Sequence, residues 1–379
     1  MKDVTIGILG GGQLAKMTAM AANRFSIDVF FLDPDKKPPA SVVAKHILGD
    51  FKNPKDVLNF SKKCDVITFD IESVNLASLV KVKKEIYPQP NIIELIQNKY
   101  KQRLFFKSKN IPVPFFKKIN NINEALNYLP VVQKSIYGGY DGRGVVLIKK
   151  KSDFEKALKV ESYIEEYIDI EKELSIIVAR DKKGNIKVYE PVEMIFNKKA
   201  NMLDFLLVPA RIDCYLYKKA KDLAISAVKA LNGIGIFAVE IFIDKKNKIF
   251  LNEIAPRPHN SGHYSIECCV TSQFEQLVRI LCNMPLGATD LYSPCGTINI
   301  IGEEKYYGKP IYEGIFDVLK MKDVYVHIYG KKETFPFRKM GHVTVKAKTV
   351  KDVLKKIKFI KNKLKVKGEI YENRDNNGK

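Results

Sequence analysis

The sequence predicts an α/β protein of two or three domains. Its 379 residues are enough for a sizeable core, and 46% of them are hydrophobic, as in globular proteins. Three stretches support this class. The chain opens with a strand, a glycine turn and a helix. A glycine-rich loop then separates two strands near residue 140, and a long apolar hairpin spans residues 235–262.

Composition places the chain among proteins of a reducing compartment. No stretch approaches the roughly 18 apolar residues of a membrane span. The first residues run directly into a strand, so we expect no signal peptide. The six cysteines are scattered and form no CxxC pair. We therefore expect a cytoplasmic protein that has no membrane partner.

The formal charge of +21 raises the possibility of nucleic-acid binding. Only nine of the 64 basic residues are arginine, however, and the lysines are spread along the whole chain. Base and phosphate recognition favours arginine forks. We expect no nucleic-acid partner, and salt-dependent binding to random DNA would be the signature of this rival function.

The N-terminal stretch, residues 1–98, reads as a Rossmann-like unit. A buried strand, 4–9, leads into GGGQLA at 10–15, a helix, and a second strand that ends before Asp33. This pattern is typical of dinucleotide binding, of another phosphate-bearing ligand, or of a tight turn alone. Glu72 follows a later strand on the ligand side of such a sheet, although it can also serve at a helix N-terminus.

The next stretch predicts a second hairpin that carries a mobile flap. A charged helix at 99–108 ends before two prolines, and a short helix follows at 122–128. The flap YGGYDGRG, 137–144, joins strands 131–136 and 144–148. Its exposed amides can fold over phosphates as a nest, although it lacks the P-loop residues. Lys134 and Arg143 supply positive charge for such an anion.

An acidic strand follows the flap. Residues 161–168 read ESYIEEYI, so the backbone near Glu165 and Glu166 can present hydrogen bonds to an adenine edge. Glu173, at the start of the next strand, can bind ribose hydroxyls. The alternative is a plain acidic turn. A helix at 218–231 should pack on the central hairpin.

The central hairpin carries Glu240 on its first strand and Glu253 on its second. A loop centred between Lys246 and Asn247 places these two carboxylates opposite each other on one face. Buried like charges repel, and a magnesium ion with substrate phosphate oxygens would resolve that conflict. The alternative is an exposed hairpin with two solvated acids. A polar cluster follows directly and comprises Arg257, His259, Asn260 and His263.

The C-terminal stretch predicts strands at 296–301, 324–329 and 342–347 and a lysine-rich helix at 350–362. Lys331 and Arg338 lie near these strands and can clamp a second phosphate. The polar tail 369–379 has no core-forming pattern, so we expect it to be disordered.

Together these features resemble the ATP-grasp superfamily and, within it, the family of 5-(carboxyamino)imidazole ribonucleotide synthases. The resemblance rests on GGGQLAKM, YGGYDGRG, LNEIAPRPHNSGH and FRKMGHV, which span residues 10–343. It implies a pre-ATP-grasp domain at 1–98, an ATP-grasp core at 99–295 with a lid at about 113–168, and a small β-rich C-terminal domain at 296–368. It also implies a homodimer that carboxylates 5-aminoimidazole ribonucleotide with ATP and bicarbonate in purine biosynthesis.

The resemblance also implies residue roles. Magnesium, or manganese in its place, would lie on Glu240 and Glu253. The reacting groups would be held by Arg257, His259, Asn260, Lys134 and Arg143. The ribonucleotide would contact Gly12, Gln13, Leu14, Glu72, Lys331 and Arg338. ATP would contact Lys99, Lys134, Gly139, Tyr140, Asp141, Gly142, Arg143, Gly144, Glu165, Glu166, Tyr167, Ile168, Glu173, Asn252 and Glu253.

The sequence departs from the family pattern at two positions. Lys99 stands where an arginine is common, which keeps the charge but loses the fork. Phe196 stands where a nucleotide-contacting histidine is frequent. One rival within the superfamily is a ligase or carboxylase with a different acceptor. Another rival is an NAD-dependent oxidoreductase built on the N-terminal turn, which leaves the flap and the carboxylate hairpin unexplained.

Overall fold

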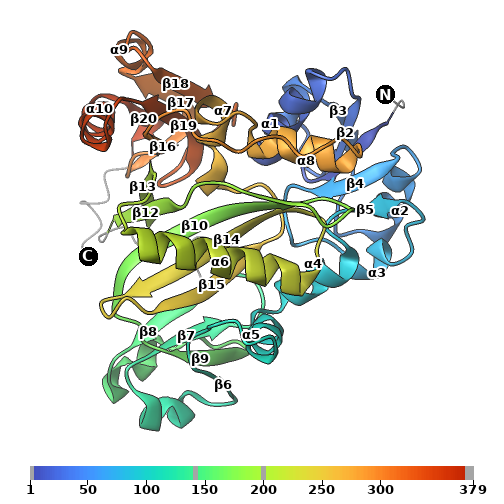
Figure 1. Cartoon of the computed structure of the whole chain (residues 1–379). Coiled ribbons are helices and arrows are strands. Elements are labelled where there is room, and N and C mark those ends of the chain that lie inside the picture. Colours follow the sequence, from blue (N-terminus) through green and yellow to red (C-terminus); the bar gives the residue numbers. More distant parts are fainter. Residues whose placement is uncertain (1–3, 140–143, 198–201, 372–379) are drawn as a thin grey trace, which may run out of the picture.

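A computed structural model of the chain describes residues 4–139, 144–197 and 202–371 (Figure 1). The N-terminal part forms a five-stranded parallel sheet with the strand order β3-β2-β1-β4-β5, so the chain winds outward in both directions from β1. This confirms the Rossmann-like prediction. The strands are β1 (Ile6–Leu9), β2 (Val29–Asp33), β3 (Lys45–Leu48), β4 (Val66–Phe69) and β5 (Glu85–Ile86). The helices are α1 (Gln13–Asn23), η1 (Pro39–Val42), α2 (Pro54–Ser61), α3 (Leu76–Leu79) and α4 (Pro90–Gln97).

The lid is a separate four-stranded antiparallel sheet of order β6-β9-β7-β8, drawn below the core in Figure 1. Helix α5 (Lys99–Ser108) leads into it with the predicted bounds. The segment 122–128 is also found where it was expected, but as a 3₁₀ helix. The lid elements are β6 (Phe116–Ile119), η2 (Ile122–Tyr128), β7 (Val131–Ser135), β8 (Val145–Ile148), η3 (Lys151–Lys156) and β9 (Ser162–Glu166).

The core is a nine-stranded sheet with the order β15-β14-β10-β12-β13-β16-β19-β18, and β11 pairs with β10. Alternate residues of β10 face opposite sides of it. Leu174 and Ile176 pack under α6 (Cys214–Leu231), whereas Ile177 packs under α8 (Gln273–Leu281). The strands are β10 (Ile170–Arg180), β11 (Ile186–Val188), β12 (Val192–Asn197), β13 (Met202–Val208), β14 (Gly235–Asp244), β15 (Ile249–Ala255), β16 (Cys295–Ile301), β18 (Val324–Ile328) and β19 (Lys339–Lys346).

Three of the C-terminal strands, β16, β18 and β19, extend the core sheet. β13 pairs with β16, with Phe205 opposite Ile298, so the sheet continues across the expected boundary at residue 296. A short second sheet and two helices cover this end of the molecule. These elements are β17 (Tyr306–Glu313), α9 (Ile315–Leu319), α10 (Val350–Lys363) and β20 (Lys365–Tyr371).

The expectation that the tail from residue 369 is disordered is wrong for its first three residues. β20 continues to Tyr371, and its last two residues pair with Tyr307 and Tyr306 of β17. The rings of Tyr306 and Tyr371 lie 5.0 Å apart, a cross-strand aromatic contact that supports the pairing. Residues 372–379 lie outside the described part of the chain.

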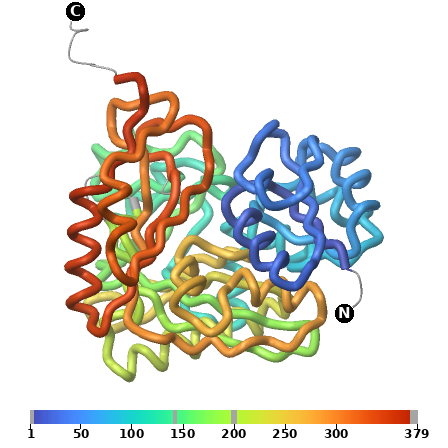
Figure 2. The backbone as a smooth tube through the Cα atoms, turned by 90° about the horizontal axis from the view of Figure 1, so that it is seen from above, coloured from blue at the N-terminus to red at the C-terminus, as the bar shows by residue number. Residues whose placement is uncertain are grey.

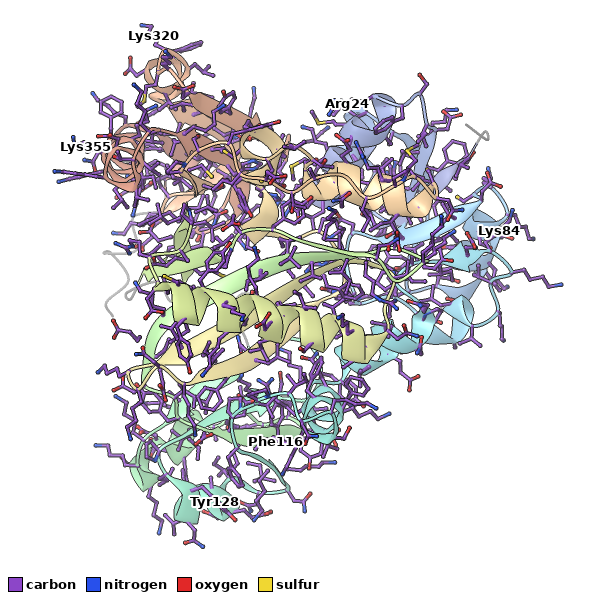
Figure 3. The ribbon with its side chains drawn as sticks, in the orientation of Figure 1. Arg24, Lys84, Phe116, Tyr128, Lys320 and Lys355 are labelled. Atoms are coloured by element: carbon purple, nitrogen blue, oxygen red, sulfur yellow. The ribbon has the colours of Figure 1, made fainter. Side chains whose placement is uncertain are left out.

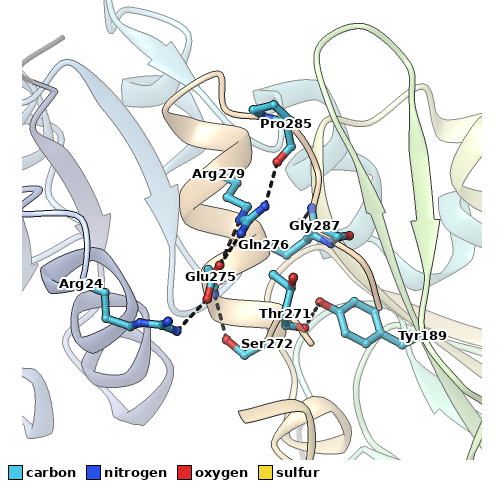
Figure 4. Close-up of polar contacts among 9 residues, drawn as sticks. All are labelled: Arg24, Tyr189, Thr271, Ser272, Glu275, Gln276, Arg279, Pro285 and Gly287. Carbon is cyan, nitrogen blue, oxygen red and sulfur yellow. Dashed lines mark hydrogen bonds and ion pairs between the residues drawn. The ribbon is translucent and has the colours of Figure 1, made fainter. Parts of the chain in front are cut away.

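Helix α8 fixes the N-terminal domain to the core. The carboxylate of Glu275 accepts hydrogen bonds from Arg24, directly after α1, at 2.8 Å and from Arg279 at 2.7 Å (Figure 4). The Lys16 ammonium donates to the carbonyl of Ile328 at 2.9 Å, which ties α1 to the C-terminal strands. Figure 2, a view from above, shows the N-terminal domain and the C-terminal strands side by side over the core. The site residues described next come from these parts.

The positive charge is distributed over separate elements. Lys84, Lys320 and Lys355 lie on different parts of the surface in Figure 3, in keeping with lysines spread along the whole sequence. Among the described residues, no helix combines the length and the apolarity needed to cross a membrane.

Candidate active site

The two carboxylates of the central hairpin lie opposite each other, as predicted, because of a bulge. Near the turn the register is centred on Lys246, since Ile243 pairs with Ile249. The register then shifts by one residue between Glu240 and Ile241, so that Glu240 pairs with Glu253. Without this bulge, Asn252 would occupy the opposed position. The predicted pair is therefore correct, but the symmetric loop assumed for it is not.

Of the two carboxylates, Glu240 is the more buried, and its pKa is raised. Its side chain is 18% exposed, whereas Glu253 opposite is exposed. Burial, followed by the negative charge of Glu253, raises the pKa of Glu240 to about 8. The amide of Asn252 donates to Glu240 at 3.4 Å. A cation between the two carboxylates would relieve the repulsion, and oxygen ligands of this kind suit Mg²⁺.

His259 faces the same carboxylate. Its Nε2 lies 3.8 Å from Glu240 Oε1. Its Nδ1 accepts from the backbone amide of Ser261 at 3.3 Å and lies 2.8 Å from the Ser261 hydroxyl, which contacts Ser175 at 2.7 Å. Because Nδ1 is an acceptor, the neutral ring carries its proton on Nε2, and that proton points toward the hairpin.

Lys134 and Glu173 lie near the hairpin carboxylates. The Lys134 ammonium donates to Asn252 Oδ1 at 3.1 Å and lies 2.7 Å from Glu165. Burial raises the pKa of Glu173 to about 7, although the charge of Lys134 lowers it. Glu165 was expected at an adenine edge, yet its side chain turns into this ion pair, and its backbone lies in β9 between β6 and β7, opposite Phe116 and Val132.

We expect Glu173→Gln to stabilise the ligand-free protein above pH 7. The Glu173 pKa is raised from its ordinary value of 4.5, so the unfolded chain releases this proton first and stability falls as pH rises from about 4.5 to about 7. The substitution removes that loss, on the order of 3 kcal/mol. Urea unfolding with a chelator at pH 5 and pH 8 measures it. Glu171→Gln, an exposed position on the same strand, is the control, and an equal gain at both pH values would contradict the assignment.

Arg257 links the hairpin loop to the N-terminal domain. Its guanidinium Nε lies 2.8 Å from Glu72 Oε1, and Glu72 is 8% exposed. Asp70, two residues earlier, also feels this charge: burial raises the pKa of Asp70, and Arg257 lowers it. The loop after β15 thus carries two contacts to different domains, Arg257 to Glu72 and His259 to Glu240.

The glycine turn before α1 is largely satisfied from within the domain. The Gly11 amide donates to Asp33 at 2.7 Å, and the amides of Gly12 and Ala15 donate to Asp70 at 3.0 and 2.7 Å. Asp33 and Asp70 therefore occupy amides that a bound pyrophosphate would need. This arrangement opposes the dinucleotide interpretation of the turn. We expected the ribonucleotide to contact Gly12 and Leu14, but the Gly12 amide is bonded to Asp70 and the Leu14 side chain is buried in the core.

Lys99 reaches the flap. Its ammonium donates to the carbonyl of Gly139 at 3.1 Å, and the Asn98 side chain contacts Tyr137. Gly139 and Gly144 both adopt positive φ, as a glycine flap requires. The four remaining flap residues in our prediction, Tyr140, Asp141, Gly142 and Arg143, lie outside the described residues.

Each of the two residues of the predicted phosphate clamp, Lys331 and Arg338, lies against an aromatic ring. The Arg338 guanidinium donates to the carbonyl of Glu333 at 2.9 Å and lies over the ring of Phe335. Lys331 lies 5.8 Å from the centre of the Tyr329 ring. Phe196, at the position of the frequent histidine, is 36% exposed, so it is not packed into the core.

Sequence reasoning missed several polar residues of this region, among them Arg103, Asp70 and Ser261. Arg103 is the one arginine of α5, whose other basic residues are lysines. Because arginine is rare in this chain, its presence there could have indicated a specific ion pair. Asp70 stood in the same acidic run as Glu72 but was passed over. Among the described residues, three or more acidic, histidine or cysteine side chains nowhere gather as a metal site.

The chain matches three known domain families. Residues 104–274 match the ATP-grasp domain, 1–97 match the ribonucleotide synthetase preATP-grasp domain, and 295–356 match the phosphoribosylaminoimidazole carboxylase C-terminal domain. The chain is therefore an ATP-grasp ligase. More narrowly, it belongs to the family of N5-carboxyaminoimidazole ribonucleotide synthases, as the following similarities show.

The solved structure of N5-carboxyaminoimidazole ribonucleotide synthetase from Thermotoga maritima superposes with a TM-score of 0.90. It is 43% identical, and the match covers 97% of this chain and 100% of that one. The Aspergillus clavatus synthase in complex with ADP and 5-aminoimidazole ribonucleotide gives a TM-score of 0.86 at 31% identity, covering 95% and 98%. The phosphoribosylaminoimidazole carboxylase of Candida albicans is 38% identical over 95% of this chain, which spans only 67% of that longer protein.

Proposed function

We propose that this chain carboxylates 5-aminoimidazole ribonucleotide with ATP and bicarbonate, in purine biosynthesis. The observation that carries the proposal is the opposed pair Glu240–Glu253 beside Lys134 and His259, with Arg257, on the loop that follows β15, paired to Glu72 of the N-terminal domain. A nucleotide site and an acceptor site are thereby set next to each other. Family membership and the ADP–ribonucleotide complex of the Aspergillus relative support the same substrates.

The first step activates bicarbonate. A bicarbonate oxygen forms a bond to the γ-phosphorus of ATP, the bond to the bridging oxygen breaks, and ADP leaves with that electron pair. Lys134 would neutralise phosphate charge, and the Nε2 proton of His259, which faces the hairpin, would hold an oxygen of the carboxyphosphate. Mg²⁺, bound by Glu240 and Glu253, would supply further positive charge to the phosphate oxygens.

The second step transfers the carboxyl group. The exocyclic amine of the ribonucleotide attacks the carbon of carboxyphosphate, or of the carbon dioxide that it releases, and phosphate leaves while the amine loses a proton. Both species are short-lived in water, so the flap and the lid must exclude solvent. Arg257, His259 and Asn260 are the residues we assign to holding the carboxyl donor. Glu72, Lys331, Arg338 and the turn at Gln13 are those we assign to the ribonucleotide.

The proposal also includes the oligomeric state and the cellular compartment of the protein. We infer a homodimer in the cytoplasm. All six cysteines are free thiols, which supports a reducing compartment.

ADP release by the purified protein tests the function. With Mg-ATP present, we expect strong stimulation by 5-aminoimidazole ribonucleotide, and bicarbonate should be required for the coupled product. Bicarbonate and the ribonucleotide are each omitted in turn. ATP turnover with another amine, but not with this ribonucleotide, would preserve the ATP-grasp assignment and overturn the acceptor.

A further inference from the structure

A buried ion network joins the lid to helix α5. Glu165 of β9 uses one carboxylate oxygen to contact the Arg103 guanidinium and the other to contact the Lys134 ammonium at 2.7 Å. The side chains of Arg103 and Glu165 are only 2% and 3% exposed. Two cations and one anion are therefore removed from water together, and their charges sum to one positive charge.

Both cations also contact the core hairpin. Arg103 Nη1 donates to the carbonyl of Leu251 at 3.1 Å, and the Lys134 ammonium donates to Asn252 Oδ1 at 3.1 Å. Leu251 and Asn252 directly precede Glu253 on β15. The network thus connects α5, two lid strands and the strand that carries the opposed carboxylates, and it fixes the lid relative to the hairpin at this point.

The sharing of Glu165 has an electrostatic consequence. Burial would raise the pKa of Glu165, but Arg103 and Lys134 lower it to about 2, so the carboxylate remains charged. With Lys134 as its sole partner, Glu165 would form a neutral buried pair and draw the ammonium toward itself. Because Arg103 occupies one oxygen, Glu165 can orient Lys134 while the network retains its positive charge for an anionic ligand.

We propose that Arg103 is a positioning residue that acts through Glu165 to hold Lys134 toward the nucleotide phosphates. The inference rests on the proposed function, in which Lys134 binds ATP. It assigns to the side chain of Glu165 a role other than adenine contact. Arg103 itself need not touch the substrate, because its guanidinium is engaged by Glu165 and the Leu251 carbonyl.

The test compares Arg103→Met with Arg103→Lys. We expect Arg103→Met to raise the KM for ATP and the Kd for a fluorescent ADP analogue about tenfold, with kcat at saturating ATP within about threefold, because Lys134 binds the ground state and the transition state alike. Arg103→Lys keeps the charge and should recover most of the affinity. Lys118→Met, which removes an exposed lid ion pair with Glu161, is the matched control and should leave both constants unchanged.

A double-mutant cycle tests whether Arg103 acts through Glu165. The Arg103→Met/Glu165→Gln variant should lose no more affinity than Glu165→Gln alone. The double variant removes both charges of the Arg103–Glu165 pair, so neither is left buried without its partner. Its ADP-analogue affinity can therefore be measured even if one of the single variants fails to fold. Additive losses, or unchanged ADP-analogue binding in Arg103→Met, would overturn the proposal. The binding assay needs no carboxylation, so absent ribonucleotide-dependent turnover in the unmodified protein would overturn the proposed function alone.

Discussion

Glu253→Gln is expected to lower ribonucleotide-dependent ADP release at least about 1,000-fold while leaving the fold intact. Glu253 lies opposite Glu240, and the pair needs a divalent cation to offset its own repulsion. A neutral amide weakens the hold on that cation. Because Glu253 is exposed, the change should alter the free energy of unfolding by no more than about 0.5 kcal/mol.

The measurements are ADP release across a magnesium titration and urea unfolding in chelator. Glu171→Gln, which removes an exposed carboxylate of β10, should behave as the unmodified protein does. Glu240→Gln should lose activity as well, yet it should stabilise the metal-free protein, because it removes the more enclosed of two opposed charges. Retention of a tenth of the activity by Glu253→Gln would rule out this metal site.

Arg257→Met should have an effect of similar size on carboxylation and a large effect on stability. Its guanidinium is the 2.8 Å partner of Glu72, which is 8% exposed. Removing it leaves a buried carboxylate without its cation, at a cost of about 3 kcal/mol. We expect turnover with the ribonucleotide to fall at least about 1,000-fold, because the carboxyl donor and the acceptor meet at this residue in the proposed mechanism.

A second substitution separates stability from chemistry. Arg257→Met/Glu72→Gln removes both charges and should regain most of the lost stability without regaining turnover. Arg24→Met removes an exposed arginine from Glu275, which keeps its bond to Arg279, and should stay within twofold of normal activity. If the double variant regains turnover together with stability, Arg257 holds the fold and not the reacting groups.

The strongest predictions from sequence concerned neighbours along the chain. The Rossmann-like sheet, helix 99–108, the strands flanking the flap and the opposed carboxylates all depend on periodicity, turns and pairing within a short segment. Even there, the bulge at the Glu240–Glu253 pair escaped prediction, since a one-residue shift follows from packing on both faces of the sheet. The tail was misjudged because Ile370 and Tyr371 find their partners on β17.

The sequence by itself thus determined the class of fold, the strands that flank the flap and the hairpin that carries Glu240 and Glu253, because residues close in sequence share a strand or a turn. The bulge that sets these two carboxylates opposite each other came from the folded sheet. Tertiary structure alone decided how distant charges pair. Asp70 takes the amides of α1 across more than 50 residues, and Arg103 reaches Leu251 across 148. Which buried ions meet depends on how whole sheets pack, and a burial cost of several kcal/mol per unpaired charge selects those partners only in the folded molecule.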